Sequence, residues 1–268
     1  MGKLLTVSQV GVFVSDQATA TRFFTTTMGL KVRARMPKMG YIALGPTLEG
    51  ADASLNLWEP AAWGLPARQV TAMIGQPTGI GYCVKDFDAT VAALRKKKVP
   101  VEVWGDGWGA FDDPDGNHYF LSGNGRLKSP PTKLGKLDFI TVASRNRARL
   151  ARFYTGTLGF TKAGGDEYAS YRLQPNGTGL MPFTPKRSHY EDPALYQSDL
   201  AAIGERTYIM LRGRDLPALQ QQLRKRKVRF AKEVAPAPWG GLEGEMLDPD
   251  GNIYQLVEDA PRTRARTR

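Results

Sequence analysis

The chain has 268 residues, of which 41% are hydrophobic and 24% are charged, and this composition excludes disordered and collagen-like proteins. Its single cysteine, Cys83, excludes an intrachain disulfide, and no apolar run approaches the about 18 residues that a membrane-spanning helix needs. Because no secretory signal is visible either, we expect a cytoplasmic protein without membrane contact.

Positive charge is in excess: 37 lysines and arginines face 26 aspartates and glutamates, which gives a formal net charge of +11. The excess is concentrated in the runs 95–98 and 224–227 and in the arginine-rich tail 260–268. Cations at helix ends complement the helix dipole, and no aromatic residues alternate with these runs as a platform for single-stranded nucleic acid would need. Nucleic acid is therefore not an expected partner.

In the first half of the chain, four stretches have the alternation or the apolar run of a β-strand: residues 7–14, 41–44, 54–58 and 80–84. An amphipathic helix is predicted over 18–27, where Gly29 provides a C-terminal cap. A second helix is predicted to begin at Asp86 and to end in the first basic run. The sequence DPDGN at 113–117 is typical of a tight turn, and it leads into a last strand at 119–121.

The second half of the chain repeats the first. Three segments recur at nearly constant offsets: 23–30 at 153–160, 94–101 at 223–230, and 113–117 at 248–252. A last strand is again predicted after the turn, at 253–257. We therefore predict two tandem domains, 1–124 and 134–259, with a linker over 125–133 and a basic, disordered tail over 260–268.

This tandem pattern resembles the vicinal-oxygen-chelate superfamily, which includes glyoxalase I, extradiol dioxygenases, fosfomycin-modifying transferases and bleomycin-sequestering proteins. The resemblance is carried by the strand ending in Val14-Ser15-Asp16, the repeated helix motif at 23–30, the helix starts at Asp86 and Asp215, and the two DPDGN turns. It implies an α+β fold of tandem glyoxalase-like domains, in each of which two βαβββ units form an open, cupped, mixed sheet.

In enzymes of this family a divalent metal lies in the cup. The family's ligand pattern falls on Gln9, Asn56, Gly79 and Phe120 in the first domain, and on Phe139, a residue near Gly179, Tyr208 and Gln255 in the second. Glycine and phenylalanine have no donor side chain, whereas a catalytic divalent site normally has about three ligands of His, carboxylate or thiolate type. The two histidines, His118 and His189, lie in different domains, so we expect neither a metal ion nor another cofactor.

Strand alternation predicts which side chains line the cups. In the first domain they are Gln9, Gly79, Gly81, Cys83, His118 and Phe120, and in the second Phe139, Tyr208, Met210, Arg212 and Gln255. Trp104 and Trp239 are expected at the rims, where they either stack on a ligand or cover the core.

Several of these residues have plainer alternatives. Cys83 is expected to be a small strand residue, because a nucleophile would need a base such as His118 within hydrogen-bond reach. Arg212 either faces an anion in the cup or pairs with an acid at the sheet edge. Glu243 and Glu245 are expected to be solvated loop carboxylates.

These observations favour a metal-free, sequestration-type protein that binds a small planar or aromatic ligand, as bleomycin-type members of the family do. The predicted ligand-binding residues, none with a catalytic role, are Gln9, Trp104, His118, Phe120, Phe139, Tyr208, Arg212, Trp239 and Gln255. Two alternatives stay open: a metal-dependent enzyme of the glyoxalase or extradiol dioxygenase type, and an interaction module with filled cups whose basic surface docks a partner. Whether the chain forms a homodimer is also open.

Overall fold

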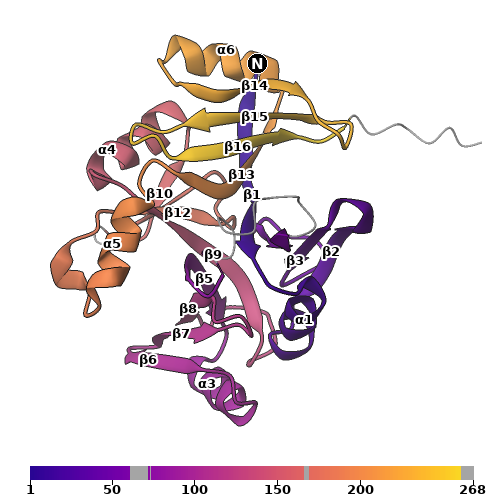
Figure 1. The fold of residues 1–268 in the computed structure, drawn as a ribbon, viewed down its shortest axis with the longest axis vertical. Coiled ribbons are helices and arrows are strands. Elements are labelled where there is room, and N and C mark those ends of the chain that lie inside the picture. Colours follow the sequence, from indigo (N-terminus) through magenta and orange to yellow (C-terminus); the bar gives the residue numbers. More distant parts are fainter. Residues whose placement is uncertain (61–71, 73, 166–168, 261–268) are drawn as a thin grey trace, which may run out of the picture.

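The computed structural model describes residues 1–60, 72, 74–165 and 169–260, and the basic tail beyond residue 260 lies outside them. In this part of the chain, strands alternate with helices in four βαβββ-like units and form two mixed sheets of eight strands each. The α6 helix lies at one end of the molecule and α3 at the other (Figure 1). None of the helices described is long and apolar enough to span a bilayer. The predicted α+β fold with tandem glyoxalase-like repeats is confirmed.

Sheet A is built from the first and the fourth unit. From edge to edge its strands are β14 (Phe230–Pro236), β15 (Leu242–Leu247), β16 (Ile253–Glu258), β13 (Arg206–Arg214), β1 (Lys3–Phe13), β4 (Ser54–Trp58), β3 (Tyr41–Gly45) and β2 (Lys31–Met36).

Sheet B is built from the second and the third unit. Its strands are β10 (Thr161–Ala163), β11 (Ser170–Arg172), β12 (Gly179–Phe183), β9 (Leu134–Ala143), β5 (Pro77–Val84), β8 (His118–Gly123), β7 (Trp108–Asp112) and β6 (Val101–Gly105).

Each sheet therefore contains strands from both sequence repeats. In sheet A, β1 of the first repeat pairs antiparallel with β13 of the second, with Gln9 opposite Met210. In sheet B, β5 pairs antiparallel with β9, with Gly81 opposite Phe139. We call these two pairings the seams. We expect from the sequence that the two units of one repeat form one sheet. In the structure the two units of each repeat instead belong to different sheets.

The helices that begin at Asp86 and Asp215 start where the sequence predicts, and the first helix starts within one residue of its predicted position. The side chains of Asp16, Asp86, Asn146 and Asp215 cap the N-termini of α1 (Gln17–Arg22), α3 (Phe87–Lys96), α4 (Arg147–Arg152) and α6 (Leu216–Lys225). Both α1 and α4 continue into a π-helical turn, at Phe23–Thr27 and Phe153–Thr157. Gly29 and Gly159 then end the segments with φ of 82° and 81°.

The core lies between the helices and one face of each sheet, and it joins the two sheets. Phe24 lies in the π-helical turn after α1, in the unit that contributes β1 to sheet A. Its ring packs on Tyr119 of β8 in sheet B, with 5.5 Å between the ring centroids. In the second repeat the hydroxyls of Tyr154 and Tyr254 are 2.6 Å apart. Each repeat is therefore a packing unit whose helix after the first strand covers the sheet that contains its last strands.

The DPDGN turns reinforce this contact between sheets. The Asp113 carboxylate accepts hydrogen bonds from the backbone N–H groups of Asp115 and Asn117, from the Asn117 side chain and from the Tyr119 hydroxyl. Asn117 also donates from Nδ2 to the Phe13 carbonyl at the end of β1. In the second repeat Asp248 and Asn252 make the same set of bonds, and Asn252 donates to Ala143. The motif thus ties a hairpin of one sheet to a seam strand of the other.

Some elements were not predicted. The edge strand β10 has only three residues, β2 is almost entirely exposed although its sequence alternates charged and apolar residues, and the helix α5 (Pro193–Ala201) has no buried residue. The seam strands β5 and β13 also carry a matching irregularity, because Gly79 and Tyr208 have φ of 69° and 56° and lie at register shifts. A non-glycine residue in this region is strained, so Tyr208 is held there by its surroundings.

Candidate functional site

Each sheet has one face toward the core and one face away from it, and we call the latter open face A and open face B. On β8, Tyr119 and Leu121 are buried in the core, so the alternating residues His118 and Phe120 belong to open face B. The predicted ligand-binding residues divide between the faces. Trp104, His118, Phe120 and Phe139 lie on sheet B, and Gln9, Tyr208, Arg212 and Gln255 lie on sheet A.

Large and small residues alternate across the middle of open face B. The register places Ala110, Phe120, Gly81, Phe139 and Gly179 opposite one another on five adjacent strands. The Phe139 ring lies over Gly81, since a Cβ at residue 81 would be 2.2 Å from two ring carbons. The rings of Phe120 and Phe139 are consequently neighbours, 5.9 Å apart between centroids and tilted by 33°.

Two exposed tryptophans extend this pair into a continuous aromatic row. Trp104 on β6 contacts Phe120 at 5.9 Å, and Trp108 on β7 contacts Phe139 at 6.2 Å between centroids. Trp104 is 52% exposed and Trp108 is 43% exposed. Trp104 therefore does not cover the core, which was one of its two expected roles. We call Trp104, Phe120, Phe139 and Trp108 the aromatic row.

A histidine and an aspartate lie beside the aromatic row. His118 and Asp112 are directly opposite each other on β8 and β7, and His118 Nδ1 is 2.8 Å from Asp112 Oδ1. The His118 ring is 6.4 Å from Trp104 and 6.3 Å from Phe120 between centroids. Asp112 was not among the predicted residues, although its place was readable: the residues that flank a DPDGN turn form a cross-strand pair.

Open face A has polar side chains at the equivalent places. Gln255 and Gln9 occupy the positions that Phe120 and Phe139 occupy on sheet B, and Met210 replaces Gly81 between them. Asn56 donates from Nδ2 to Gln9 Oε1 at 2.5 Å. Asn56 is fully buried, and its Oδ1 has no hydrogen-bond partner among the described residues. Burial also raises the pKa of the neighbouring Tyr41.

A second aromatic group on sheet A consists of Phe13, Trp58 and Tyr208. Their ring centroids are 5.1 to 5.5 Å apart, and all three pairs meet edge to face. The Trp58 ring also lies against Gly11, because a Cβ there would be 3.0 Å from it. These rings fill space against one another, so this face offers less free aromatic surface than open face B.

The charged residues of sheet A that the sequence singled out are paired. Arg212 Nε is 3.5 Å from Asp259 Oδ1, which is the edge pairing that the sequence left as one alternative. Glu243 and Glu245 were expected in a solvated loop, but they lie on β15 and are ion-paired with Lys232 and Arg206. The expectation failed because the two glutamates alternate with Leu242, Gly244 and Met246. Such a short sequence with a central glycine does not by itself indicate a strand.

The residues at the family's metal positions do not fit a metal ion. The seams bring Gln9, Asn56, Tyr208 and Gln255 together on sheet A, and Gly79, Phe120, Phe139 and Gly179 on sheet B. The first set has amides and a phenol, with the Gln9 oxygen already bonded to Asn56, and the second has no donor side chain. No group of three or more His, Cys, Asp or Glu side chains that could hold a metal occurs in the described residues. We derive no chemistry through a metal here.

Two other predicted positions, Cys83 and Trp239, lie apart from the aromatic row. Cys83 is buried and its Sγ lies 3.2 Å from Ser122 Oγ, away from the His118 pair. Burial raises the pKa of its thiol to about 11, so it is not an activated nucleophile. Trp239 is 36% exposed in the turn after β14, and no ring contact of it occurs among the described residues.

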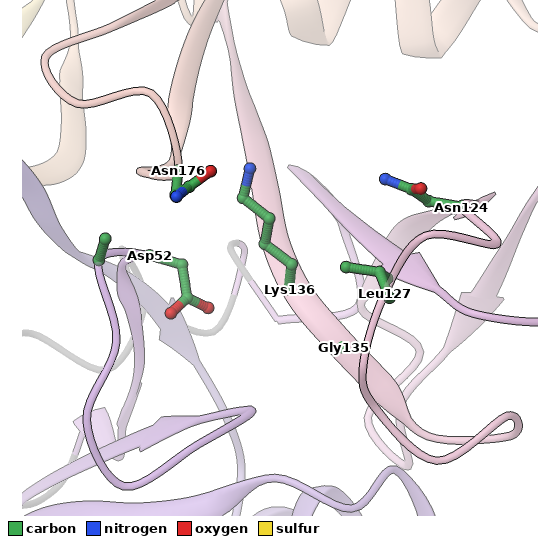
Figure 2. Close-up of a pocket in the computed structure, with 7 residues that line it drawn as sticks. Asp52, Asn124, Leu127, Gly135, Lys136 and Asn176 are labelled. Atoms are coloured by element: carbon green, nitrogen blue, oxygen red, sulfur yellow. The ribbon is translucent and has the colours of Figure 1, made fainter.

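A cavity of about 310 Å³ lies away from both aromatic groups, near the linker. Figure 2 shows Lys136 between Asp52 and Asn176 on one side and Leu127 and Asn124 on the other. Its charges are neutralised internally, because Lys136 pairs with Asp138 at 2.8 Å and Asp52 pairs with Arg33 at 2.7 Å. We therefore regard this cavity as space between neighbouring chain segments and not as a ligand-binding site.

Comparison with known proteins gives one family. The sequence model of the Glyoxalase/Bleomycin resistance protein/Dioxygenase superfamily matches residues 6–119 and 136–256. No curated protein sequence matches the chain.

Solved structures share the fold. A Bacillus subtilis protein whose name points to a dioxygenase aligns over 97% of this chain and 86% of its own, with a TM-score of 0.65 and 15% identity. Glyoxalase I from Zea mays aligns over 96% of this chain and 92% of its own, with a TM-score of 0.64 and 15% identity. A superfamily member from Sphaerobacter thermophilus aligns over 46% of this chain and 95% of its own, with a TM-score of 0.40 and 28% identity.

Proposed function

We propose that this chain, which belongs to the Glyoxalase/Bleomycin resistance protein/Dioxygenase superfamily, binds a planar aromatic small molecule on open face B without a metal ion. The observation that carries the proposal is the aromatic row, in which two exposed tryptophans flank two phenylalanines on one sheet face. The exposed tryptophan rings, which are held in place by their contacts with the phenylalanines, are a stacking surface for a flat ligand.

The contrast between the two faces supports this assignment. At the two central positions, open face B has Phe120 and Phe139 where open face A has Gln255 and Gln9. Phe139 is itself buried, at 5% exposure, so the free ring surface of open face B is offered mainly by Trp104 and Trp108. The +11 net charge would in addition favour the approach of ligands with partial negative charge.

The first test is the metal content of protein purified without a metal-chelating tag, measured by elemental mass spectrometry. We expect well below a tenth of an equivalent per chain. About one equivalent of a transition metal would overturn the metal-free proposal and favour a glyoxalase- or dioxygenase-type enzyme instead.

The second test measures binding of 7-hydroxy-4-methylcoumarin by quenching of tryptophan fluorescence. We expect Phe120→Gln, which introduces the residue found at the equivalent place on open face A, to weaken binding by at least about fivefold, since stacking contributes about 1 kcal/mol beyond area burial. Gln255→Ala on open face A is the matched control and should leave the affinity unchanged. Equal loss in both variants, or no binding by the wild type, would contradict the proposal.

A further inference from the structure

We infer that the aromatic ligand of open face B carries an ionisable hydroxyl group, a phenol or an enol, and that His118 binds this hydroxyl. The inference rests on the proposed function, because it concerns the same ligand. It adds the polar group that selects among flat aromatic molecules, which a stacking surface alone does not do.

The first step is the orientation of the imidazole. Asp112 lies directly across the hairpin from His118, and its carboxylate is 2.8 Å from Nδ1. A carboxylate accepts hydrogen bonds, so Nδ1 carries a proton and donates a hydrogen bond to Asp112. In the neutral ring Nε2 is then an acceptor, and in the charged ring it is a donor. Asp112 is thus a positioning residue that fixes what His118 presents to a ligand.

The second step is the location of the pair. Its side chains are partly exposed, 25% for His118 and 32% for Asp112. The His118 ring lies within 6.4 Å of Trp104 and 6.3 Å of Phe120 between centroids. The Trp104 and Phe120 rings are inclined by 62° to each other, so a flat molecule that stacks on Trp104 would meet Phe120 with its edge, beside the imidazole.

The third step is the chemistry of the group that fits. In the described part of the chain the carboxylates near His118 are Asp112 on β7, which pairs with it, and Glu102 on β6, which accepts from the indole Nε1 of Trp104 at 3.2 Å. Two carboxylates repel a ligand with a permanent negative charge. A hydroxyl that can give up its proton instead matches both states of Nε2, as a donor to the neutral ring and as an acceptor from the charged ring.

The fourth step is the internal comparison. The positions equivalent to Asp112 and His118 on sheet A are Leu247 and Ile253, which are also directly opposite each other. The hairpin therefore folds with an apolar pair at this place, so the histidine and the aspartate are not required by the turn. The equivalence also supplies a substitution, His118→Ile, that the same fold already contains.

The experiment compares 7-hydroxy-4-methylcoumarin with its methyl ether, 7-methoxy-4-methylcoumarin, which stacks alike but has no proton to share. In the wild type we expect the hydroxyl compound to bind about tenfold more tightly, the effect of one hydrogen bond in a partly buried site. His118→Ile should reduce that preference to less than about twofold. His189→Ile, at the other histidine of the chain, is the control and should preserve it.

Asp112→Asn tests the positioning role with a spectroscopic signature. The bound hydroxycoumarin should show the red-shifted absorption of a proton shared with His118, and the variant should lose this shift while its melting temperature stays near that of the wild type. If both coumarins bind the wild type equally, the inference is overturned and the proposed function stands. If neither binds, both fall, and if His118→Ile keeps the tenfold preference, the hydroxyl is recognised elsewhere and the inference fails.

Discussion

Gly81 shows how one residue shapes open face B. The Phe139 ring lies over it and reaches Phe120 on the far side, so the absence of a side chain at residue 81 is what lets the two rings meet. The equivalent residue on sheet A is Met210, and there the flanking positions have amides. Strand alternation predicts that these residues share a face, but it does not predict the tilt of the rings or the Trp104 and Trp108 contacts that complete the aromatic row.

We expect Gly81→Ala to displace the Phe139 ring, because the new Cβ would be 2.2 Å from two of its carbons. Overpacking of this kind costs about 1–3 kcal/mol in the free energy of unfolding, measured by urea denaturation. Coumarin binding should weaken in parallel. Gly156→Ala is the control, because a Cβ there meets open space; in its helical turn it should not lower the free energy of unfolding, and it should leave coumarin binding unchanged. Unchanged binding by Gly81→Ala would show that the ring pair is not part of the site.

At the level of elements, the DPDGN turns account for both the predictable and the unpredictable parts of the fold. The turn itself is readable from Pro, Asp and Gly, and its recurrence marks the repeat. The contact of Asn117 with the carbonyl of Phe13 is not readable, because it joins residues of different sheets. Similarly, the edge strands β2 and β10 were not predicted, because β10 has only three residues and β2 is rich in charge and almost entirely exposed.

We expect Asp113→Ala to lower the free energy of unfolding by roughly 3 kcal/mol, since it removes the acceptor of four hydrogen bonds from a buried place. Asp248→Ala should have the same effect, because its bonds are the same. Asp88, exposed on α3, is the control, and its replacement by Ala should change stability by less than about 0.5 kcal/mol. Chemical denaturation measures all three, and an effect confined to one turn would contradict their equivalence.

Asp138 on β9 should make the fold sensitive to acid. Burial alone would raise its pKa, but Arg172 and Lys136 lower it below the usual value of 3.8. A carboxyl with a lowered pKa in the folded state contributes stability above pH 3.8, and this contribution is lost as the pH falls through the folded pKa. We therefore expect the difference in unfolding free energy between wild type and Asp138→Asn to be largest at neutral pH and to shrink below pH 3.8. A difference that stays constant in urea titrations across this range would exclude the charge as its cause.

At the level of the whole molecule, the sequence predicts four similar units but not which units share a sheet. The seam strands of the two repeats are equivalent, so β1 could pair with β5 or with β13 using the same alternation of side chains. The choice depends on the path of the linker between the repeats. At the end of the linker, Lys133 donates from Nζ to the carbonyls of Thr26 and Thr27, and the N–H of Leu134 donates to the carbonyl of Met28. As a result, the eight expected metal positions are grouped by sheet rather than by repeat, into one polar and one apolar set.

The seams also determine how the protein should unfold. Each sheet takes four strands from each repeat, and each repeat packs its core between both sheets, so neither half can open without breaking a seam and exposing core residues of the other. We expect a single cooperative transition in calorimetry, with equal calorimetric and van't Hoff enthalpies. Asp113→Ala in the first repeat and Asp248→Ala in the second should each move that whole transition to lower temperature. Two resolved transitions, or a variant that shifts half of the signal, would mean that the repeats unfold separately and that the seams contribute little to stability.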